Sequence, residues 1–403
     1  MKNVILLTID ALRRDALGCY GGEGGLTPFI DSIQDKCIRF NNTQSTGTYT
    51  EASFPGILTS SYYLDHGMSE RKTGKLSFKR TLISEALKPK GIVTVAFHSS
   101  PYLSNYFGWN KGWDTFHDGM DLPVTEKVPF VKASVVNKKV GDWLSSQKGR
   151  LAEKPFFLWV HYMDVHEPYV PERKYVDVVD PSIGLTEDQM FALYKDVLLN
   201  RDVSDENVVK TLKKLYLASV PIADTAVKEF FGILQEMDFL KDTVIIIGSD
   251  HGDEFGEHGS LSHDGKFYSE LVNVPLMVYD PTLTKGQVCD TLVSTIDISP
   301  TIVHLFGLEP VEAFQGRSLL PTEDYPVKGV YGNEINKVGT TWIEKGVHFY
   351  REGDLKIIYR EKEDTWELYD LKEDPKELSN IVDSSPAAEG MKEKLRPRIK
   401  KGG

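Results

Sequence analysis

Carboxylate and imidazole groups at two points of the chain could hold a divalent cation. Asp10 comes directly after the apolar run 4–9, and Asp250 and His251 follow the apolar run 243–248. A site that includes an imidazole suits manganese or zinc better than calcium, which prefers oxygen ligands throughout. We therefore expect Asp10, Asp250 and His251 to bind one divalent cation, with Mn or Zn favoured over Mg and Ca. The alternative is that these residues form capped turns around a buried histidine.

Further cationic and imidazole side chains could contact an anion opposite that cation. His161 and His166 come at the end of the apolar run 156–160, and His263 and Lys266 lie in a glycine-rich segment downstream. Such groups can stabilise or protonate the oxygens of an ester. We expect His166 and Lys266 to contact the substrate anion, with His263 as the alternative to Lys266. His161 is expected either to bind substrate or to be a buried structural histidine.

The elements that must position these residues alternate between strands and helices. The expected strands are 4–9, 93–97, 156–161, 243–248 and 276–279, and the expected helices are 27–36, 78–87, 135–145 and 208–238. This alternation predicts an α/β fold with a mainly parallel central sheet flanked by helices. Active sites of open α/β sheets form at the carboxyl ends of the strands, where the candidate residues lie.

The C-terminal part of the chain has a different pattern. Short alternating runs at 329–334, 345–351, 355–360 and 367–370 predict a small antiparallel sheet subdomain. We therefore expect a catalytic domain over residues 1–325 and a C-terminal subdomain over residues 326–403. The polar segment 168–207 is expected to be an inserted loop or lid.

Composition and charge restrict the classes of partner. The chain has 403 residues, 40% hydrophobic and 26% charged, which is typical of a globular protein. A net charge of −12 argues against binding to nucleic acid or to anionic lipid. The three cysteines and the short apolar N-terminal run predict reduced thiols, no membrane span and a cytoplasmic location. The oligomeric state is left open.

The order of the motifs resembles that of the sulfatase family in the alkaline-phosphatase-like superfamily. The matching blocks are Leu7-Thr8-Ile9-Asp10 through Gly21, Thr27-Pro28, Asp250-His251-Gly252 through Leu276, Asp297-Ile298-Ser299-Pro300-Thr301, Gly316-Arg317-Ser318-Leu319 and Glu367-Leu368-Tyr369-Asp370. The resemblance implies the alkaline-phosphatase-like α/β fold with a small C-terminal antiparallel sheet subdomain. It also implies a metal-dependent ester hydrolase or transferase.

The sequence departs from the family pattern at the nucleophile. Family sulfatases carry Cys or Ser in a Cys/Ser-x-Pro-x-Arg block, where that residue is oxidised to formylglycine, and a Thr follows nine residues later. Counting back from Thr59 gives Thr50, whereas the sequence Ser53-Phe54-Pro55-Gly56 keeps the proline but not the spacing. The arginine is absent from both alignments. We expect Thr50 to be the nucleophile and a ligand of the cation, with a helix starting near Ser53; the alternative for Thr50 is an ordinary helix-capping threonine.

Three functions follow from these alternatives. The leading prediction is hydrolysis or transfer of phosphate esters, such as phosphodiesters or phosphate and phosphonate monoesters, through Thr50. The second is a sulfatase that uses a formylglycine made from Ser53, and the third is a non-catalytic anion-binding protein with the same fold. In each case the partner is a small-molecule phosphate or sulfate ester. Asp164, His166 and His263 could form a second metal set, but their spacing is poor, so one metal is expected.

Overall fold

The central element of the protein is an eight-stranded mixed sheet. The computed structural model describes residues 2–22, 25–66, 74–263, 265–322, 325, 328–338 and 341–399, with the backbone alone for 336–338 and 341–344. The strand order is β10-β2-β9-β6-β1-β5-β3-β4. Only β9 runs against the others, because it pairs antiparallel with both β6 and β2. The strands are β1 (Asn3–Ile9), β2 (Cys37–Gln44), β3 (Val93–His98), β4 (Thr115–His117), β5 (Phe156–Tyr162), β6 (Thr243–Ser249), β9 (Leu276–Tyr279) and β10 (Gln287–Ser294).

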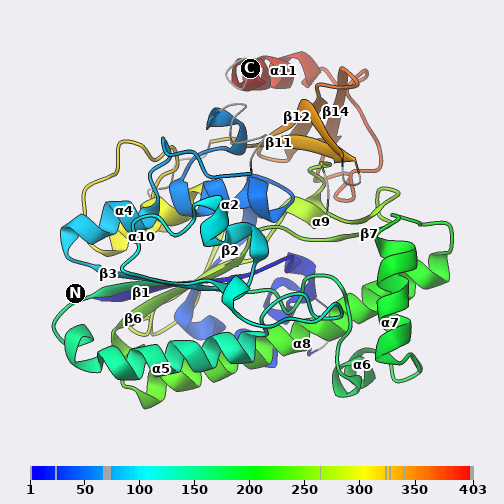
Figure 1. The fold of residues 1–403 in the computed structure, drawn as a ribbon. Coiled ribbons are helices and arrows are strands. Elements are labelled where there is room, and N and C mark those ends of the chain that lie inside the picture. The colour runs from blue at the N-terminus through cyan, green and yellow to red at the C-terminus, as the bar shows by residue number, and fades with distance from the viewer. Residues whose placement is uncertain are drawn as a thin grey trace.

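Helices cover both faces of this sheet (Figure 1). In β1, Ile5, Leu7 and Ile9 pack on the side of α5 and α8, whereas Val4 and Leu6 pack on the side of α2, α4 and α10. This period-two alternation explains why β1 is a continuous apolar run, since both of its faces are buried. The helices are α1 (Pro28–Ser32), α2 (Thr50–Thr59), α4 (Ile83–Leu87), α5 (Ala133–Leu151), α6 (Arg173–Val179), α7 (Glu187–Leu193), α8 (Glu206–Glu236), α9 (Ser269–Val272), α10 (Ile298–Leu305) and α11 (Ala388–Ile399).

A four-stranded antiparallel sheet with α11 forms the C-terminal part of the structure (Figure 1). Its strands, in sequential order, are β11 (Val330–Val338), β12 (Thr341–Glu352), β13 (Leu355–Arg360) and β14 (Thr365–Asp370). The α/β class, the flanking helices and the small C-terminal sheet were therefore correctly predicted. The division at residue 325 stays a prediction. Residues of β11 contact the segment that leads into α2, as described below.

Several elements differ from the sequence-based expectation. The expected helix over 78–87 is confined to α4, and Phe78 is 85% exposed. The segment 168–207 contains α6 and α7 and is not a plain loop; Thr186 and Gln189 cap the start of α7 reciprocally. The strands β2 and β10 at one edge of the sheet were missed, since polar residues interrupt their apolar pattern. Among the described residues, no helix combines the length and apolarity that crossing a bilayer requires.

Candidate functional site

The candidate metal ligands are brought together by two neighbouring parallel strands, β1 and β6. β1 lies between β6 and β5, and Ile9 pairs with Ser249 on one side and with Tyr162 on the other. The next residue after β1 is Asp10, and the next after β6 is Asp250. The parallel register therefore places these two carboxylates side by side at the carboxyl edge of the sheet, at the position expected for an active site in this architecture.

Asp10, Asp250 and His251 form a compact, fully buried set. Each of them offers a ligand atom within 4.8 Å of the other two. Nε2 of His251 lies 3.5 Å from Oδ1 of Asp10 and 3.4 Å from Oδ2 of Asp250. Among the described residues, Oδ1 of Asp10 and Nε2 of His251 are buried without a hydrogen-bond partner. Because unsatisfied buried polar atoms are costly, two of them facing one another fit a cation between them.

The charges of this cluster perturb its titration. Burial would raise the pKa of Asp10, but His166, His161 and His251 together lower it below its usual value. Burial and the charge of Asp10 raise the pKa of Asp250. Burial would lower the pKa of His251, but Asp250 and Asp10 raise it to about 9. In the metal-free protein a proton on His251 therefore balances the two carboxylates, and a cation would replace that proton.

The backbone around Asp10 is held by specific contacts. Ala11, the next residue, has φ of +55°, a conformation that L-residues seldom adopt. Its N–H donates to Oδ1 of Asp250 (3.3 Å), and the N–H of Leu12 donates to Oγ of Ser249 (3.0 Å). The strained turn thus ties the loop after β1 to the loop after β6. These hydrogen bonds hold Asp10 after β1 and Asp250 after β6 in place relative to one another.

Both candidate nucleophiles face this cluster from α2. Thr50 is the first residue of the helix and Tyr49 is its N-cap, so Thr50 is not a capping threonine. The Thr50 hydroxyl donates to Oδ2 of Asp10 (3.2 Å), and the Ser53 hydroxyl lies 3.5 Å from Oδ2 of Asp250. The expectation that the helix starts near Ser53 was wrong by three residues. As a consequence, Thr50 and Ser53 lie one turn apart on the same helix face.

His161 is placed to orient Asp10. It is fully buried in β5, where Nδ1 lies 2.9 Å from Oγ1 of Thr8 and Nε2 lies 3.2 Å from Oδ2 of Asp10. With both ring nitrogens bonded inside the protein, the ring has no nitrogen left for a substrate. The geometry supports the structural alternative for His161, which orients a candidate ligand as outer-shell groups do in metal sites.

The structure brings His263, and not Lys266, next to the cluster. The His263 ring lies 4.4 Å from the ring of His251 and 5.1 Å from the ring of His166, measured between centroids. Lys266 instead donates to both carboxylate oxygens of Glu254 (3.1 and 2.8 Å) and to the carbonyl of His258 (2.8 Å). The geometry therefore does not support the expected contact of Lys266 with the anion, and His263, the alternative, lies nearer to the cluster.

His166 faces the same region from the loop after β5. Its Nδ1 donates to the carbonyl of Glu167 (2.7 Å). Burial would lower the pKa of His166, but the charges of Asp10, Glu167 and Asp253 raise it above its usual value. A protonated His166 suits an anionic ligand. Asp164, two residues earlier, accepts from the N–H of Ala133 (2.8 Å). It belongs to none of the convergent groups of possible metal ligands among the described residues, so a second metal set with His166 is not supported.

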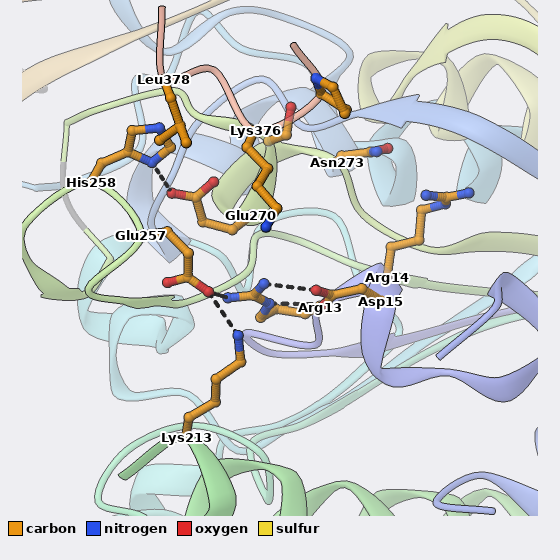
Figure 2. Close-up of a pocket in the computed structure, with 12 residues that line it drawn as sticks. Arg13, Arg14, Asp15, Lys213, Glu257, His258, Glu270, Asn273, Lys376 and Leu378 are labelled. Atoms are coloured by element: carbon orange, nitrogen blue, oxygen red, sulfur yellow. Dashed lines mark hydrogen bonds and ion pairs between the residues drawn. The ribbon is translucent and has the colours of Figure 1, made fainter. Parts of the chain in front are cut away.

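Arg13 anchors the segment that carries Asp250 and His251. Figure 2 shows its guanidinium bridging the carboxylates of Asp15 and Glu257 at the edge of a cavity of about 460 Å³. The same guanidinium donates to the carbonyl of Asp253 (2.9 Å). Gly252 is required here, since a Cβ on it would lie 2.1 Å from the carbonyl oxygen of Glu270. The positions of Asp250 and His251 thus depend on a close backbone contact with α9.

Sequence reasoning missed residues that complete the site. Asp253 is buried and bonded to His263, and Glu334 of β11 accepts from the N–H and hydroxyl of Thr48 (2.7 and 2.8 Å) just before α2. Asp253 directly follows the Asp-His-Gly motif, which was the available signal. For Glu334 no sequence signal existed, because it reaches Thr48 across 286 positions of sequence.

Two family profiles and curated relatives match the chain. The sulfatase family profile matches residues 2–308, and a profile described as the C-terminal region of N-sulphoglucosamine sulphohydrolase matches residues 256–402. An arylsulfatase of Clostridium perfringens is 24% identical over 448 residues, covering 95% of this chain and 90% of that protein.

Solved structures share the fold over the whole chain. A protein in complex with its substrate D-glucosamine-2-N,6-O-disulfate superposes with a TM-score of 0.78 at 19% identity, covering 100% of this chain and 98% of that one. A phosphonate monoester hydrolase of Agrobacterium radiobacter superposes with a TM-score of 0.75 at 18% identity, covering 100% of this chain and 95% of that one.

Proposed function

The chain belongs to the sulfatase family of ester hydrolases, and we propose that its substrates are sulfate esters of small-molecule alcohols. The observation that carries the proposal is the family match over residues 2–308, the region that contains every candidate ligand. An arylsulfatase among its relatives supports sulfate as the transferred group. The leading sequence-based prediction, phosphate esters, becomes the second candidate.

The residues divide into two groups around the ester. Asp10, Asp250 and His251 would hold one divalent cation, which neutralises developing charge on the sulfuryl oxygens when bound. The imidazole ligand favours Mn or Zn in this role. On the opposite side, His166 and His263 would contact the remaining oxygens of the anion. Their rings are 5.1 Å apart, so both can reach one tetrahedral group.

Hydrolysis of a sulfate ester by the family chemistry needs a formylglycine, and Ser53 is its candidate precursor, although the arginine of the family block is absent here. Ser53 is fully buried and its hydroxyl lies 3.5 Å from Oδ2 of Asp250, so an aldehyde hydrate at this position would face the cation site. The conversion removes two hydrogens from Ser53. The intact mass of the purified protein therefore reports directly on it.

A second candidate function is supported by one specific contact. Thr50, which cannot form formylglycine, has its hydroxyl 3.2 Å from Asp10 at the first position of α2. A hydroxyl next to a cation suits direct attack on phosphorus through a threonyl ester. The fold shared with a phosphonate monoester hydrolase fits this candidate as well.

One substrate panel separates the two functions. Protein loaded with Mn, Zn, Mg or Ca is assayed on nitrophenyl sulfate, nitrophenyl phosphate, a bis-nitrophenyl phosphodiester and a phenylphosphonate ester. We expect the highest kcat/KM on the sulfate and a mass lower by two hydrogens at Ser53. If the protein prefers a phosphorus ester and Ser53 is unmodified, the sulfatase proposal is wrong and the second candidate function is favoured.

The matched controls are two buried aspartates. Asp10→Asn should abolish turnover, because it removes a candidate ligand. Asp164→Asn should retain it, since Asp164 bonds Ala133 at the start of α5 and lies outside the cluster. If both variants stay fully active, the Asp10 cluster is not the site of the reaction.

A further inference from the structure

The cavity beside Arg13 has no role in the function proposed so far. Its volume of about 460 Å³ is within the range of pockets that hold small molecules (Figure 2). It is bordered by the segment that follows β1, by α8, by α9 and by the C-terminal segment 375–378. Neither the candidate ligands of the cation nor the hydroxyls and histidines that face them border this cavity, so its lining is a separate set of residues.

Two carboxylates in the lining of the cavity are already neutralised. Both oxygens of Asp15 accept hydrogen bonds from Arg13 (2.9 and 2.7 Å). Oε1 of Glu257 accepts from Arg13 and from Lys213 (2.9 Å each). Burial would raise the pKa of Glu257, but the charges of Arg13 and Lys213 lower it to about 2, so this carboxylate stays charged and paired.

The third carboxylate in the lining, Glu270, is bound by His258. Nδ1 of His258 lies 2.6 Å from Oε1 of Glu270, and Nε2 lies 3.2 Å from the carbonyl oxygen of Glu377. Both ring nitrogens thus face acceptors. Burial would lower the pKa of His258, but Glu270 raises it above its usual value. The contacts therefore favour a ring that is protonated at both nitrogens and balances Glu270.

The contacts around Glu270 argue against a metal ion at this place. Ligand atoms of Glu254, His258 and Glu270 lie within 4.8 Å of one another. However, the ammonium group of Lys266 donates to both carboxylate oxygens of Glu254 (3.1 and 2.8 Å) and to the carbonyl of His258. Lys266 thus already supplies the positive charge that a cation would bring. The cavity needs another kind of ligand.

Two cations line the cavity without a carboxylate partner in the described part of the chain: Arg14 and Lys376. Nε of Arg14 is buried and has no hydrogen-bond partner there. The Arg14 guanidinium lies over the ring of Tyr20, 5.2 Å from its centroid, and Arg39 lies 5.3 Å from the same centroid. In Figure 2 the side chain of Lys376 points into the cavity, and Arg14 borders it on the side of Asn273. The free charges of the lining are therefore positive.

A further arginine adds to the positive charge near Arg14. Arg351 of β12 is 6% exposed and forms no ion pair among the described residues. Burial lowers the pKa of Arg351, Glu377 and Asp354 raise it, and the charge of Arg14 lowers it. Glu377 is itself shared with Lys356, at 2.8 Å. Because like charges repel, this surplus of positive charge favours an anion, although the chain as a whole carries a net charge of −12.

We propose that this cavity is a second anion site, in which Arg14 and Lys376 bind a tetrahedral oxyanion, sulfate or phosphate. The planar guanidinium of Arg14 can donate two parallel hydrogen bonds to such a group, and the ammonium of Lys376 adds a second positive charge. Oδ1 of Asn273 faces Nε2 of Gln44 (3.5 Å), which leaves the N–H groups of the Asn273 amide for a third contact. The inference goes beyond the proposed ester hydrolysis and does not depend on it.

Titration calorimetry at constant ionic strength tests the proposal by counting bound anions. The probes are inorganic sulfate, inorganic phosphate and phenylphosphonic acid, which has no ester bond. We expect the unmodified protein to bind one anion more per chain than the double variant Arg14→Gln/Lys376→Gln. An extra site for the inorganic anions identifies a free oxyanion as the ligand, and an extra site for phenylphosphonic acid alone identifies the charged group of an organic molecule. Equal numbers of bound anions in both proteins, with every probe, would overturn the proposal.

The chain offers a matched control for the loss of two positive charges. Arg39 lies as close to the Tyr20 ring as Arg14 does, and Lys372 is exposed four positions before Lys376, but neither lines the cavity. The double variant Arg39→Gln/Lys372→Gln should therefore keep the extra anion. If it loses that anion as well, net charge is the cause and the cavity is not the site.

A single surface substitution keeps the test decisive if the Arg14 variant does not fold. Lys376 is exposed, so Lys376→Glu should fold normally. We expect it to weaken binding of the extra anion by at least about tenfold, because a charged hydrogen bond is replaced by repulsion. Unchanged affinity would overturn the proposal.

Kinetics separates the cavity from the ester site. In Lys376→Glu, the KM for nitrophenyl sulfate should stay within about twofold of that of the unmodified protein, since Lys376 does not contact the ester. A rise in KM that matches the loss of anion affinity would make the cavity part of the ester site and overturn its assignment as a second site. If no ester of the panel is hydrolysed, the proposed function fails, whereas the calorimetric count still decides this inference.

Discussion

The hydroxyl of Thr50 donates a hydrogen bond of 3.2 Å to Oδ2 of Asp10, although the residues are 40 positions apart. Nε2 of His161 lies 3.2 Å from the same oxygen. Oδ2 of Asp10 is thus held from two sides, whereas Oδ1 has no hydrogen-bond partner among the described residues and faces His251. Hydrogen bonds to Oδ2 fix the orientation of the carboxylate, and Oδ1 is available to a cation.

The first prediction concerns the two hydroxyls of α2. On sulfate esters we expect Ser53→Ala to abolish turnover, because the formylglycine precursor is lost. Thr50→Val, which keeps the shape of the side chain, removes one hydrogen bond to a charged oxygen and should lower kcat/KM by about 10–100-fold. Steady-state kinetics on nitrophenyl sulfate measures both. The reverse ranking of the two variants would assign the nucleophile to Thr50 and favour phosphorus esters.

The second prediction concerns protons and the cation. The carboxylates of Asp250 and Asp10 raise the pKa of His251 to about 9 in the metal-free protein. At pH 7 a cation must therefore displace about one proton on binding, and apparent affinity should rise about tenfold per pH unit up to that pKa. Calorimetry in buffers of different ionisation enthalpy counts the protons released. Binding of Zn²⁺ without any release at pH 7 would contradict the assignment of His251 as a ligand.

The raised pKa of His251 also makes the stability of the metal-free protein depend on pH. The pKa of His251 is raised from 6.5 to about 9, so protonation favours the folded state. This stabilisation is complete below about pH 6.5 and is lost as the pH rises through about 9; it amounts to roughly 3 kcal/mol. Urea unfolding of metal-free protein at pH 6 and pH 9.5 measures it. His251→Gln should remove this pH dependence, and a variant that keeps it in full would show that another group is responsible.

The third prediction concerns His161. His161→Phe keeps the aromatic packing against Phe54, whose ring centroid lies 5.0 Å away, but removes the bond to Asp10. Loss of such an outer partner typically costs about 10–100-fold in metal affinity. The control is His98→Phe: His98 is buried in β3 beside His161 and bonds the carbonyl of Ser100 (3.1 Å). Competition with a chelator should show weaker metal binding in His161→Phe and not in His98→Phe. An equal loss of metal affinity in both variants would mean that disturbed packing, and not the lost bond to Asp10, is the cause.

The fourth prediction concerns Glu334. This buried carboxylate of β11 accepts two hydrogen bonds from Thr48, two residues before Thr50. Glu334→Gln should lower the free energy of unfolding by about 2 kcal/mol, since a charged acceptor of two bonds is lost. The control, Glu352→Gln in β12, breaks a surface ion pair with Lys394 and should cost no more than about 1 kcal/mol. Thermal unfolding compares them, and equal melting temperatures would show that Glu334 does not brace α2.

The architecture and the grouping of the candidate metal ligands follow from the apolar runs of the sequence. The continuous apolar runs of β1, β5 and β6 required strands buried on both faces, and parallel strands bring their last residues to one edge. For this reason the sequence alone predicts that Asp10, Asp250 and His251 lie together. Their ligand atoms do lie within 4.8 Å of one another, while their role as ligands stays a prediction.

Packing in three dimensions selects the further side chains that lie beside these candidate ligands. The resemblance to the family motif favoured Lys266 over His263, but side-chain direction depends on local turns. Ser262 has φ of +64°, His263 bonds Asp253, and Lys266 pairs with Glu254 instead. Spacing likewise could not place both Thr50 and Ser53 on one face, because the helix starts three residues earlier than its proline suggested. Contacts such as that of Glu334 with Thr48 join distant segments through packing, and no local sequence pattern encodes them.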